Sequence, residues 1–236
     1  MIFNDLLNLI FPSCCYNCDE IIRENKYICQ NCFQKIKETN YHKSSKSNEL
    51  YVKLYKNFDI EGAFSMYYYE EGSALKTLIH YLKYKNKKNI GIWLGEIYGK
   101  ILKENNEYNF EYIIPVPLHK NKEQSRGYNQ SKMIAKGLNK HIPGVVSDEL
   151  LIKIKDTEPQ TTKNKEKRRQ DIINSFNLAK PELLNNKRIL LVDDIITTCS
   201  TIKECIKTIK KTINCKITIC SIGRTIPKCI NTSDIE

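Results

Sequence analysis

The segment from Ile189 to Thr201 constrains the fold of this chain more than any other. It begins with four consecutive apolar residues, continues with two aspartates and ends in a turn rich in threonine and serine. The residues that follow, 202–209, return to apolar side chains at helical spacing. A short apolar run of this kind is typical of a strand buried on both faces. The order of strand, acidic pair, polar turn and helix therefore predicts an α/β fold, with the turn at the carboxyl edge of the sheet, where ligands bind.

The polar turn has the chemistry of a phosphate site. Backbone N–H groups at the start of a helix lack intrahelical partners and carry partial positive charge. Four hydroxyl side chains add donors: Thr197, Thr198, Ser200 and Thr201. Asp193 and Asp194 would repel a bare phosphate, but they can accept hydrogen bonds from sugar hydroxyls or lie near Mg²⁺. A phosphate with a neighbouring ribose satisfies both halves; a phosphoacceptor or metal site of another α/β fold is the alternative.

This segment resembles the phosphoribosyl pyrophosphate (PRPP) motif of type I phosphoribosyltransferases, which is a hydrophobic strand, two acidic residues and then T-T-G-x-T. The resemblance implies that Asp193 and Asp194 contact the ribose hydroxyls, that residues 197–201 wrap the 5′-phosphate, and that Mg²⁺ accompanies PRPP. Cys199 stands where that family usually has glycine. A non-glycine residue at positive φ costs about 1–2 kcal/mol, so the conformation of Cys199 is a specific question for the structure.

Two Cys-x-x-Cys pairs near the start of the chain predict a metal site. They are separated by ten residues and consist of Cys15, Cys18, Cys29 and Cys32. Four thiolates complete a closed tetrahedral Zn²⁺ site with no open position, so the metal would be structural. The alternative is redox-active or simply buried cysteines. Cys14 adjoins the first pair and is either a substitute ligand or a spectator.

Further motifs narrow the resemblance to the ComF family. They are P-V-P-L at 115–118, R-G-Y-N-Q at 126–130, P-Q-T at 159–161 and a segment from Arg168 to Phe176. Asp171 stands where relatives often have asparagine. The resemblance covers residues 11–224 and implies a zinc module followed by a phosphoribosyltransferase-like domain. It also implies a role in natural competence, on incoming single-stranded DNA in the cytoplasm alongside a helicase partner.

The leaving pyrophosphate of PRPP would need cations and donors. Arg126 has a fork that suits a pair of phosphate oxygens, and backbone groups of Val116, Pro117 and Leu118 are the other candidates; an ion pair with a surface carboxylate is the alternative for Arg126. The complete predicted PRPP site is Asp193, Asp194, Ile195, Ile196, Thr197, Thr198, Cys199, Ser200, Thr201, Val116, Pro117, Leu118 and Arg126. The sequence indicates no nucleophile or general base. An active phosphoribosyltransferase of nucleotide or related metabolism, without a DNA role, is therefore the alternative to a competence factor.

The formal net charge of +11 favours partners that carry phosphates. Lysines are abundant throughout the chain, however, so charge alone supports nucleic-acid binding and a solvated basic surface about equally. The candidates for DNA contacts are Lys83, Lys85, Lys87, Lys88, Lys165, Lys167, Arg168 and Arg169.

The chain divides into a zinc module and linker at 1–45, a phosphoribosyltransferase-like domain at 46–226 and a tail at 227–236. Strands are predicted near 62–69, 112–116, 150–154, 188–193 and 215–222, forming a mostly parallel sheet flanked by helices such as 73–83 and 90–103. The segment 38–47 is predicted to be a linker with a solvated His42. No apolar run is long enough to span a membrane, and the cytoplasm is the expected location.

Overall fold

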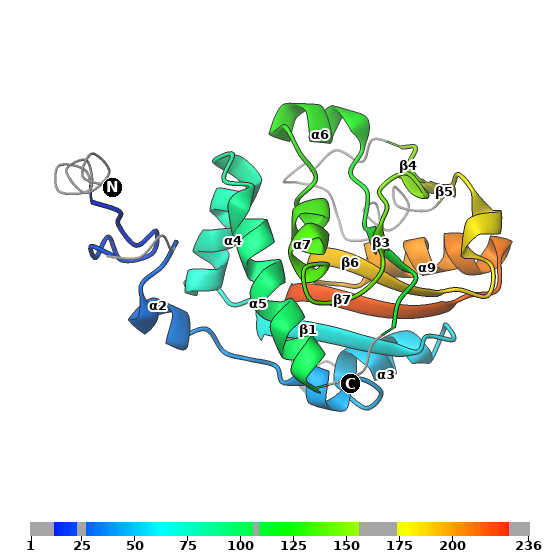
Figure 1. Ribbon diagram of the computed structural model, residues 1–236, viewed down its shortest axis with the longest axis horizontal. Helices are drawn as coiled ribbons and strands as arrows, with labels where there is room; N and C mark the ends of the chain where they lie inside the picture. The colour runs from blue at the N-terminus through cyan, green and yellow to red at the C-terminus, as the bar shows by residue number, and fades with distance from the viewer. Residues whose placement is uncertain (1–11, 23–26, 106–108, 156–173, 227–236) are drawn as a thin grey trace, which may run out of the picture.

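A computed structural model describes residues 12–22, 27–105, 109–155 and 174–226 (Figure 1). Its centre is a five-stranded sheet in which all paired strands run parallel. The order across the sheet is β1 (Gly62–Tyr68), β7 (Lys216–Arg224), β6 (Arg188–Ile196), β2 (Tyr112–Pro115) and β3 (Val145–Val146). The strand that carries the acidic pair, β6, is therefore the middle strand of the sheet.

Helices cover both faces of this sheet (Figure 1). Within the described residues, the α-helices are α2 (Gln30–Gln34), α3 (Glu49–Tyr55), α4 (Ala74–Tyr84), α5 (Asn89–Asn105), α6 (Lys120–Arg126), α7 (Gln130–Leu138) and α9 (Ser200–Thr212). Two 3-10 helices of this part of the chain, η1 (Tyr41–Ser44) and η2 (Pro181–Leu184), lie in connections. A separate antiparallel pair consists of β4 (Leu151–Lys153) and β5 (Phe176–Leu178).

The alternation of side chains along β6 divides the interior into two cores. Leu190 and Val192 pack with residues of α4, α5 and α7, whereas Ile189 and Leu191 pack with residues of α3, α9 and the β4–β5 pair. Figure 1 accordingly shows α7 and α9 on opposite sides of β6. Since both faces of β6 are covered, its apolar run has no polar alternation, which is why the sequence pattern predicted a buried parallel strand.

The predicted α/β class is confirmed, and four of the five predicted strands lie in the parallel sheet as β1, β2, β6 and β7. The prediction for 150–154 is wrong in its pairing, because β4 pairs with β5 outside that sheet. The side chain of Ile152 is 36% exposed, so only one face of this strand contacts the core. The short strand β3 and the helix α6 were not predicted.

The segment 38–47 is also more ordered than a linker. It contains η1, and Tyr41 and His42 are buried. The predicted solvated His42 is therefore wrong, and burial lowers the pKa of its imidazole. Within the described residues, no helix is long and apolar enough to cross a membrane.

The cysteine-rich segment packs against α4 and α5. The ring of Tyr16 stacks on Tyr81 of α4 with centroids 4.2 Å apart, and Thr77 of α4 donates to the side-chain carbonyl of Asn17 at 3.0 Å. Trp93 of α5 lies 5.5 Å from the ring of Tyr27. The segment thus shares the hydrophobic core of the sheet face that carries α4, α5 and α7.

Candidate functional site

The loop from β6 to α9 encloses a small pocket at the carboxyl edge of the sheet. Its cavity volume is about 30 Å³, within about 210 Å³ of space that includes open solvent. The lining residues are Asp193, Ile195, Ile196, Thr197, Thr198, Cys199, Ser200, Thr201 and Ile202. Eight of the nine residues predicted on this segment therefore meet at one pocket. The strand continues to Ile196, so the aspartates lie near its end rather than after it.

Cys199 adopts the left-handed conformation, with φ 68° and ψ 4°, immediately before α9. This is the conformation for which glycine is the usual residue. The Cys199 side chain is buried and accepts a contact from the guanidinium of Arg224 at 3.8 Å. The loop therefore has the backbone conformation that glycine adopts freely, and Cys199 adopts it at the steric cost of its Cβ.

Arg224 contacts the loop at Cys199 and is itself held by an ion pair. It is almost completely buried at the end of β7, and its Nε donates to Glu49 Oε1 at 2.8 Å. Tyr41 donates to the same oxygen at 2.7 Å. Burial raises the pKa of Glu49, but these two hydrogen bonds and the charge of Arg224 outweigh burial and keep that pKa below its usual value. No sequence pattern pointed to this group, because its members come from three separate segments.

The two aspartates differ in their surroundings. Asp193 lines the loop pocket, and its Oδ1 accepts a hydrogen bond from Ser131 of α7 at 3.2 Å. Asp194 does not line that pocket. Its Oδ2 lies 2.6 Å from Nζ of Lys83, at the end of α4. The structure therefore presents one carboxylate to the loop and uses the other to hold a lysine, whereas the sequence motif predicted the same role for both.

These contacts separate the pKa values of the pair. Burial and the adjacent charge of Asp194 raise the pKa of Asp193 to about 7. Burial also acts to raise the pKa of Asp194, but the charge and hydrogen bond of Lys83 outweigh it and lower that pKa. Asp194 and Lys83 therefore form a charged pair, while Asp193 titrates near neutral pH.

Arg126, at the end of α6, acts on the acidic pair through its charge. Its positive charge lowers the pKa of Asp194, and its guanidinium carbon sits 5.6 Å from the centre of the Tyr84 ring. The predicted backbone donors are less favourable. The N–H of Val116 donates to Val192 O at 2.8 Å and is not free for a ligand, and Pro117 has no N–H. Of that group, only the Leu118 amide remains a candidate.

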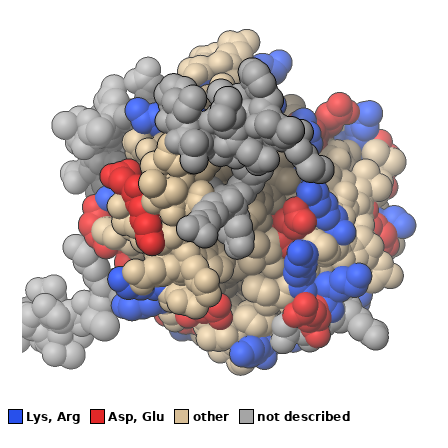
Figure 2. Space-filling model, turned by 60° about the vertical axis from the view of Figure 1, so that its left-hand side comes forward, with Lys and Arg blue, Asp and Glu red and all other residues tan. Residues whose placement is uncertain are grey.

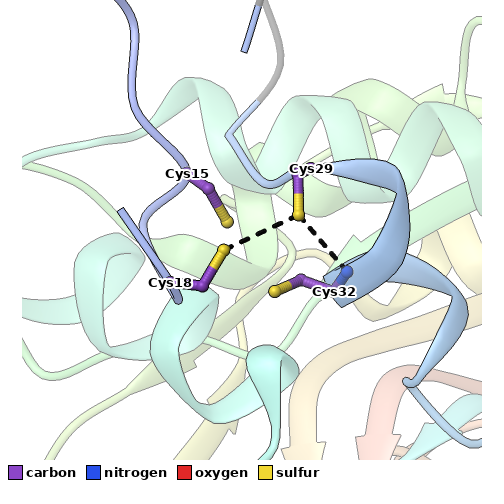
Figure 3. A group of neighbouring side chains, drawn as sticks. All are labelled: Cys15, Cys18, Cys29 and Cys32. Atoms are coloured by element: carbon purple, nitrogen blue, oxygen red, sulfur yellow. Dashed lines mark hydrogen bonds between the residues drawn. The ribbon is translucent and has the colours of Figure 1, made fainter. Parts of the chain in front are cut away.

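The four predicted metal ligands converge in space (Figure 3). The Sγ atoms of Cys15, Cys18, Cys29 and Cys32 all lie within 4.8 Å of one another, and those of Cys18 and Cys29 are 3.7 Å apart. A tetrahedral zinc site with Zn–S bonds of about 2.3 Å has sulfurs about 3.8 Å apart, so this set fits Zn²⁺. All four thiols are free, and Cys14 is exposed and outside the group.

Local hydrogen bonds support the thiolate form of Cys15. Burial acts to raise the pKa of Cys15, but backbone N–H groups of Cys29, Asn17 and Cys18 outweigh it and lower that pKa to about 7. The Asn17 side chain donates to Cys32 Sγ at 3.4 Å. A thiolate is the form that binds metal, so Cys15 is the thiol most easily converted to a ligand, whereas burial contributes to a raised pKa at Cys18, Cys29 and Cys32.

The candidate DNA contacts fall into three groups. Lys83 is paired with Asp194 inside the site; Lys85, Lys87 and Lys88 are exposed between α4 and α5; and Lys165, Lys167, Arg168 and Arg169 lie outside the described residues. Figure 2 shows basic and acidic side chains interspersed on the face that it presents, rather than one continuous basic patch.

Comparison with known sequences identifies relatives over a little more than half of the chain. Competence protein F of Haemophilus influenzae is 30% identical over 146 residues, which cover 58% of this chain and 62% of that protein. The chain is a homologue of competence protein F. The DNA utilization protein YhgH of Escherichia coli O157:H7 is 28% identical over 134 residues, covering 55% of this chain and 58% of that protein. The chain thus spans about three-fifths of the length of competence protein F and of YhgH, and no protein-family model matches it.

Among solved structures, this homologue of competence protein F is similar to nucleotide-metabolism enzymes. The allosteric regulatory enzyme of purine biosynthesis aligns with a TM-score of 0.41 and 15% identity, over 61% of this chain and 30% of that chain. A purine phosphoribosyltransferase of Pyrococcus horikoshii aligns with a TM-score of 0.33 and 15% identity, over 61% and 86%. Since both scores are below 0.5, the fold assignment depends on the strand order and pairing of the chain itself.

Proposed function

We propose that this protein binds PRPP with Mg²⁺ at the β6–α9 loop and acts on incoming single-stranded DNA during natural competence. The observation that carries the proposal is the loop pocket, in which Asp193 faces the hydroxyl-rich turn of residues 197–201 at the carboxyl edge of the sheet. A sugar hydroxyl would meet the carboxylate, and the 5′-phosphate would meet the backbone and hydroxyl donors. The printed names of the relatives, competence protein F and DNA utilization protein, support the biological setting.

The cations near the acidic pair support a pyrophosphate-bearing ligand over a simple sugar phosphate. Lys83 and Arg126 approach the pair from α4 and α6, two helices that do not line the loop pocket. Mg²⁺ would neutralise pyrophosphate oxygens together with these side chains. This arrangement also favours a second candidate, an active phosphoribosyltransferase in which pyrophosphate leaves the anomeric carbon of PRPP. Both candidates would work in the cytoplasm. A competence helicase would be the partner of the competence factor only, since the enzyme would have no DNA role.

Thermal unfolding with PRPP and Mg²⁺ tests the pocket. We expect PRPP to raise the Tm of the wild type, and the Asp193→Asn variant to lose most of that shift, because the amide changes a sugar-hydroxyl acceptor without removing volume. Asp59→Asn, a change at an exposed carboxylate beside Lys210, should keep the shift. The absence of any shift in the wild type would refute PRPP binding. Release of pyrophosphate on addition of candidate nitrogen bases would distinguish the enzyme from a binding protein.

A further inference from the structure

A second and larger cavity lies between the start of α5, the end of α6 and the start of α7. Its volume is about 330 Å³. It shares no lining residue with the loop pocket, and it is separated from the acidic pair by the first turn of α7, where Ser131 contacts Asp193. No residue of the predicted PRPP site lines this cavity, so a ligand there would be a separate one.

The lining of this cavity is basic. Lys88 contributes from the residue before α5, and Lys132 and Lys136 contribute from successive turns of α7, against a single acid, Glu123. Lys132 pairs with Asp148 at 2.5 Å. Among the described residues, Lys88 and Lys136 have no such partner. With Glu123 and Asp148 counted, the three lysines leave a net positive charge at the cavity, which favours an anion.

Three of the residues that line the cavity are apolar or aromatic. Met133 and Tyr128 are buried and Ile92 is half-buried, and the Tyr128 hydroxyl is already used, because it donates to the carbonyl of Leu82. A lining that combines these side chains with lysines suits a ligand that has both a flat ring and a phosphate, which is the chemistry of a nucleotide.

The rim continues into an exposed aromatic side chain. Tyr84 is 65% exposed, and the Arg126 guanidinium lies 5.6 Å from its ring centre. Arg126 directly precedes Gly127, which lines the cavity; Figure 1 shows the ends of α4 and α6 close together at this corner. Exposed aromatic rings beside cations are what proteins use to stack the bases of single strands.

The walls of the cavity are held rigidly. A Cβ at Gly95 of α5 would clash with the carbonyl of Ile134, and a Cβ at Gly137 of α7 would clash with the carbonyl of Ile92. The two helices therefore pack backbone against backbone. The cavity at their N-terminal ends is consequently preformed, and a ligand would not have to order it.

We propose that this cavity binds a nucleotide, with its phosphate at Lys88 and Lys136 and its base against Met133. A free nucleotide and one unit of a single-stranded nucleic acid present the same chemistry here. In the strand, Tyr84 stacks on the neighbouring base. The single-strand case rests on the proposed DNA function. The cavity and the loop pocket share no lining residue, so Lys88 and Lys136 can be changed without altering the loop pocket.

The test compares two double variants. Lys88→Ala/Lys136→Ala removes the unpaired lysines, and Lys207→Ala/Lys211→Ala removes two exposed lysines of α9 on the opposite face. The probes are thymidine 5′-monophosphate, by calorimetry, and a 5′-hydroxyl oligothymidylate of about eight nucleotides, by fluorescence anisotropy. Because the first variant neutralises two fewer phosphates, it should bind the oligonucleotide about tenfold more weakly at low salt, and the slope of log K against log [salt] should fall by about 1.4. Affinities for both probes equal to those of the control variant would overturn the proposal.

Tyr84 distinguishes the two sources of the ligand. Replacing Tyr84 by alanine should weaken oligonucleotide binding roughly 5- to 150-fold, the loss of one stacked base, while Tyr84→Phe and the exposed control Tyr55→Ala retain it. Such a result assigns the cavity to a strand. Equal affinity for both probes, with no effect of Tyr84, assigns it to a free nucleotide. Binding of ribose 5-phosphate tests the loop pocket separately from the cavity. This binding should be unchanged in Lys88→Ala/Lys136→Ala and lost in Asp193→Asn.

Discussion

Lys83 Nζ lies 2.6 Å from Asp194 Oδ2 and joins the end of α4 to the end of β6. The side chains of the pair are 23% and 7% exposed, so water screens them little. The same helix carries Thr77 and Tyr81, which contact the cysteine-rich segment. One helix thus connects the four-cysteine group to the acidic pair, and both ends of that connection can be tested.

Replacing Lys83 by methionine should destabilise the protein strongly. Methionine keeps most of the volume but leaves the Asp194 carboxylate buried without its partner, which costs on the order of 3–5 kcal/mol. Urea unfolding measures the loss. Lys85→Met, two residues away and exposed, should change stability by less than about 0.5 kcal/mol. Adding Asp194→Asn to Lys83→Met should recover part of the loss; an equal loss in the Lys83 and Lys85 variants would contradict a stabilising role for the pair.

Asp193 should make stability depend on pH between about 4 and 7. Its pKa in the folded protein is raised to about 7, whereas an unfolded aspartate titrates near 3.9. In this window the folded state binds the extra proton, so its contribution to the free energy of unfolding falls as pH rises, by up to about 1.4 kcal/mol per pH unit. Asp193→Asn removes this slope. Denaturant unfolding at several pH values measures the difference between the two proteins; parallel curves would contradict the raised pKa.

Zinc removal should be visible in tryptophan fluorescence. Trp93 is the single tryptophan of the chain, and its ring lies 5.5 Å from Tyr27 and 5.7 Å from Phe33 of the cysteine-rich segment. We expect about one zinc per chain by elemental analysis, and a red shift of Trp93 emission when a chelator removes the ion, because the segment then undocks. Cys15→Ser should act in the same way. Cys14→Ser, at an exposed thiol outside the group, should leave the emission unchanged.

At Cys199, glycine should be more stabilising than alanine. Alanine keeps a Cβ at φ 68°, whereas glycine adopts that conformation without steric cost. Both variants remove the thiol that faces Arg224. The difference between their free energies of unfolding therefore measures the conformational cost of a Cβ at this position, about 1 kcal/mol in favour of glycine. In ordinary helical positions the order is reversed. Thermal unfolding of the two variants measures this difference. Equal Tm values for the alanine and glycine variants would show that the loop can leave the left-handed conformation without cost.

The strands of the parallel sheet were predictable where the local pattern of apolar residues indicates a strand buried on both faces. The residues 189–192 have no polar alternation, because both faces of β6 are covered, and this pattern is visible in a single sequence. The segment 150–154 has a similar short apolar run, yet it pairs with residues 176–178 outside the sheet. Strand pairing is a relation between distant segments, and the local run contains no information about its partner.

The candidate site shows the same division. The residues of the hydroxyl turn and the two Cys-x-x-Cys pairs are close in sequence, so their spacing predicted a common pocket and a common metal group. Three further side chains contact this segment from other elements: Ser131 from α7, Lys83 from α4 and Arg224 from β7. The sequence around each of them does not indicate these contacts. The difference between Asp193 and Asp194 also depends on these partners.

The sequence by itself therefore determined the chemical types at the site: four thiols at metal-ligand spacing, and an acidic pair before a hydroxyl-rich helix start. These are properties of contiguous residues, whose relative positions the backbone limits to a few ångströms. Only the tertiary structure decided which aspartate faces the pocket, which lysine neutralises the other, and where a second basic cavity opens. Those features arise from the packing of helices that are far apart along the chain, and packing geometry is set by the whole core rather than by any local pattern.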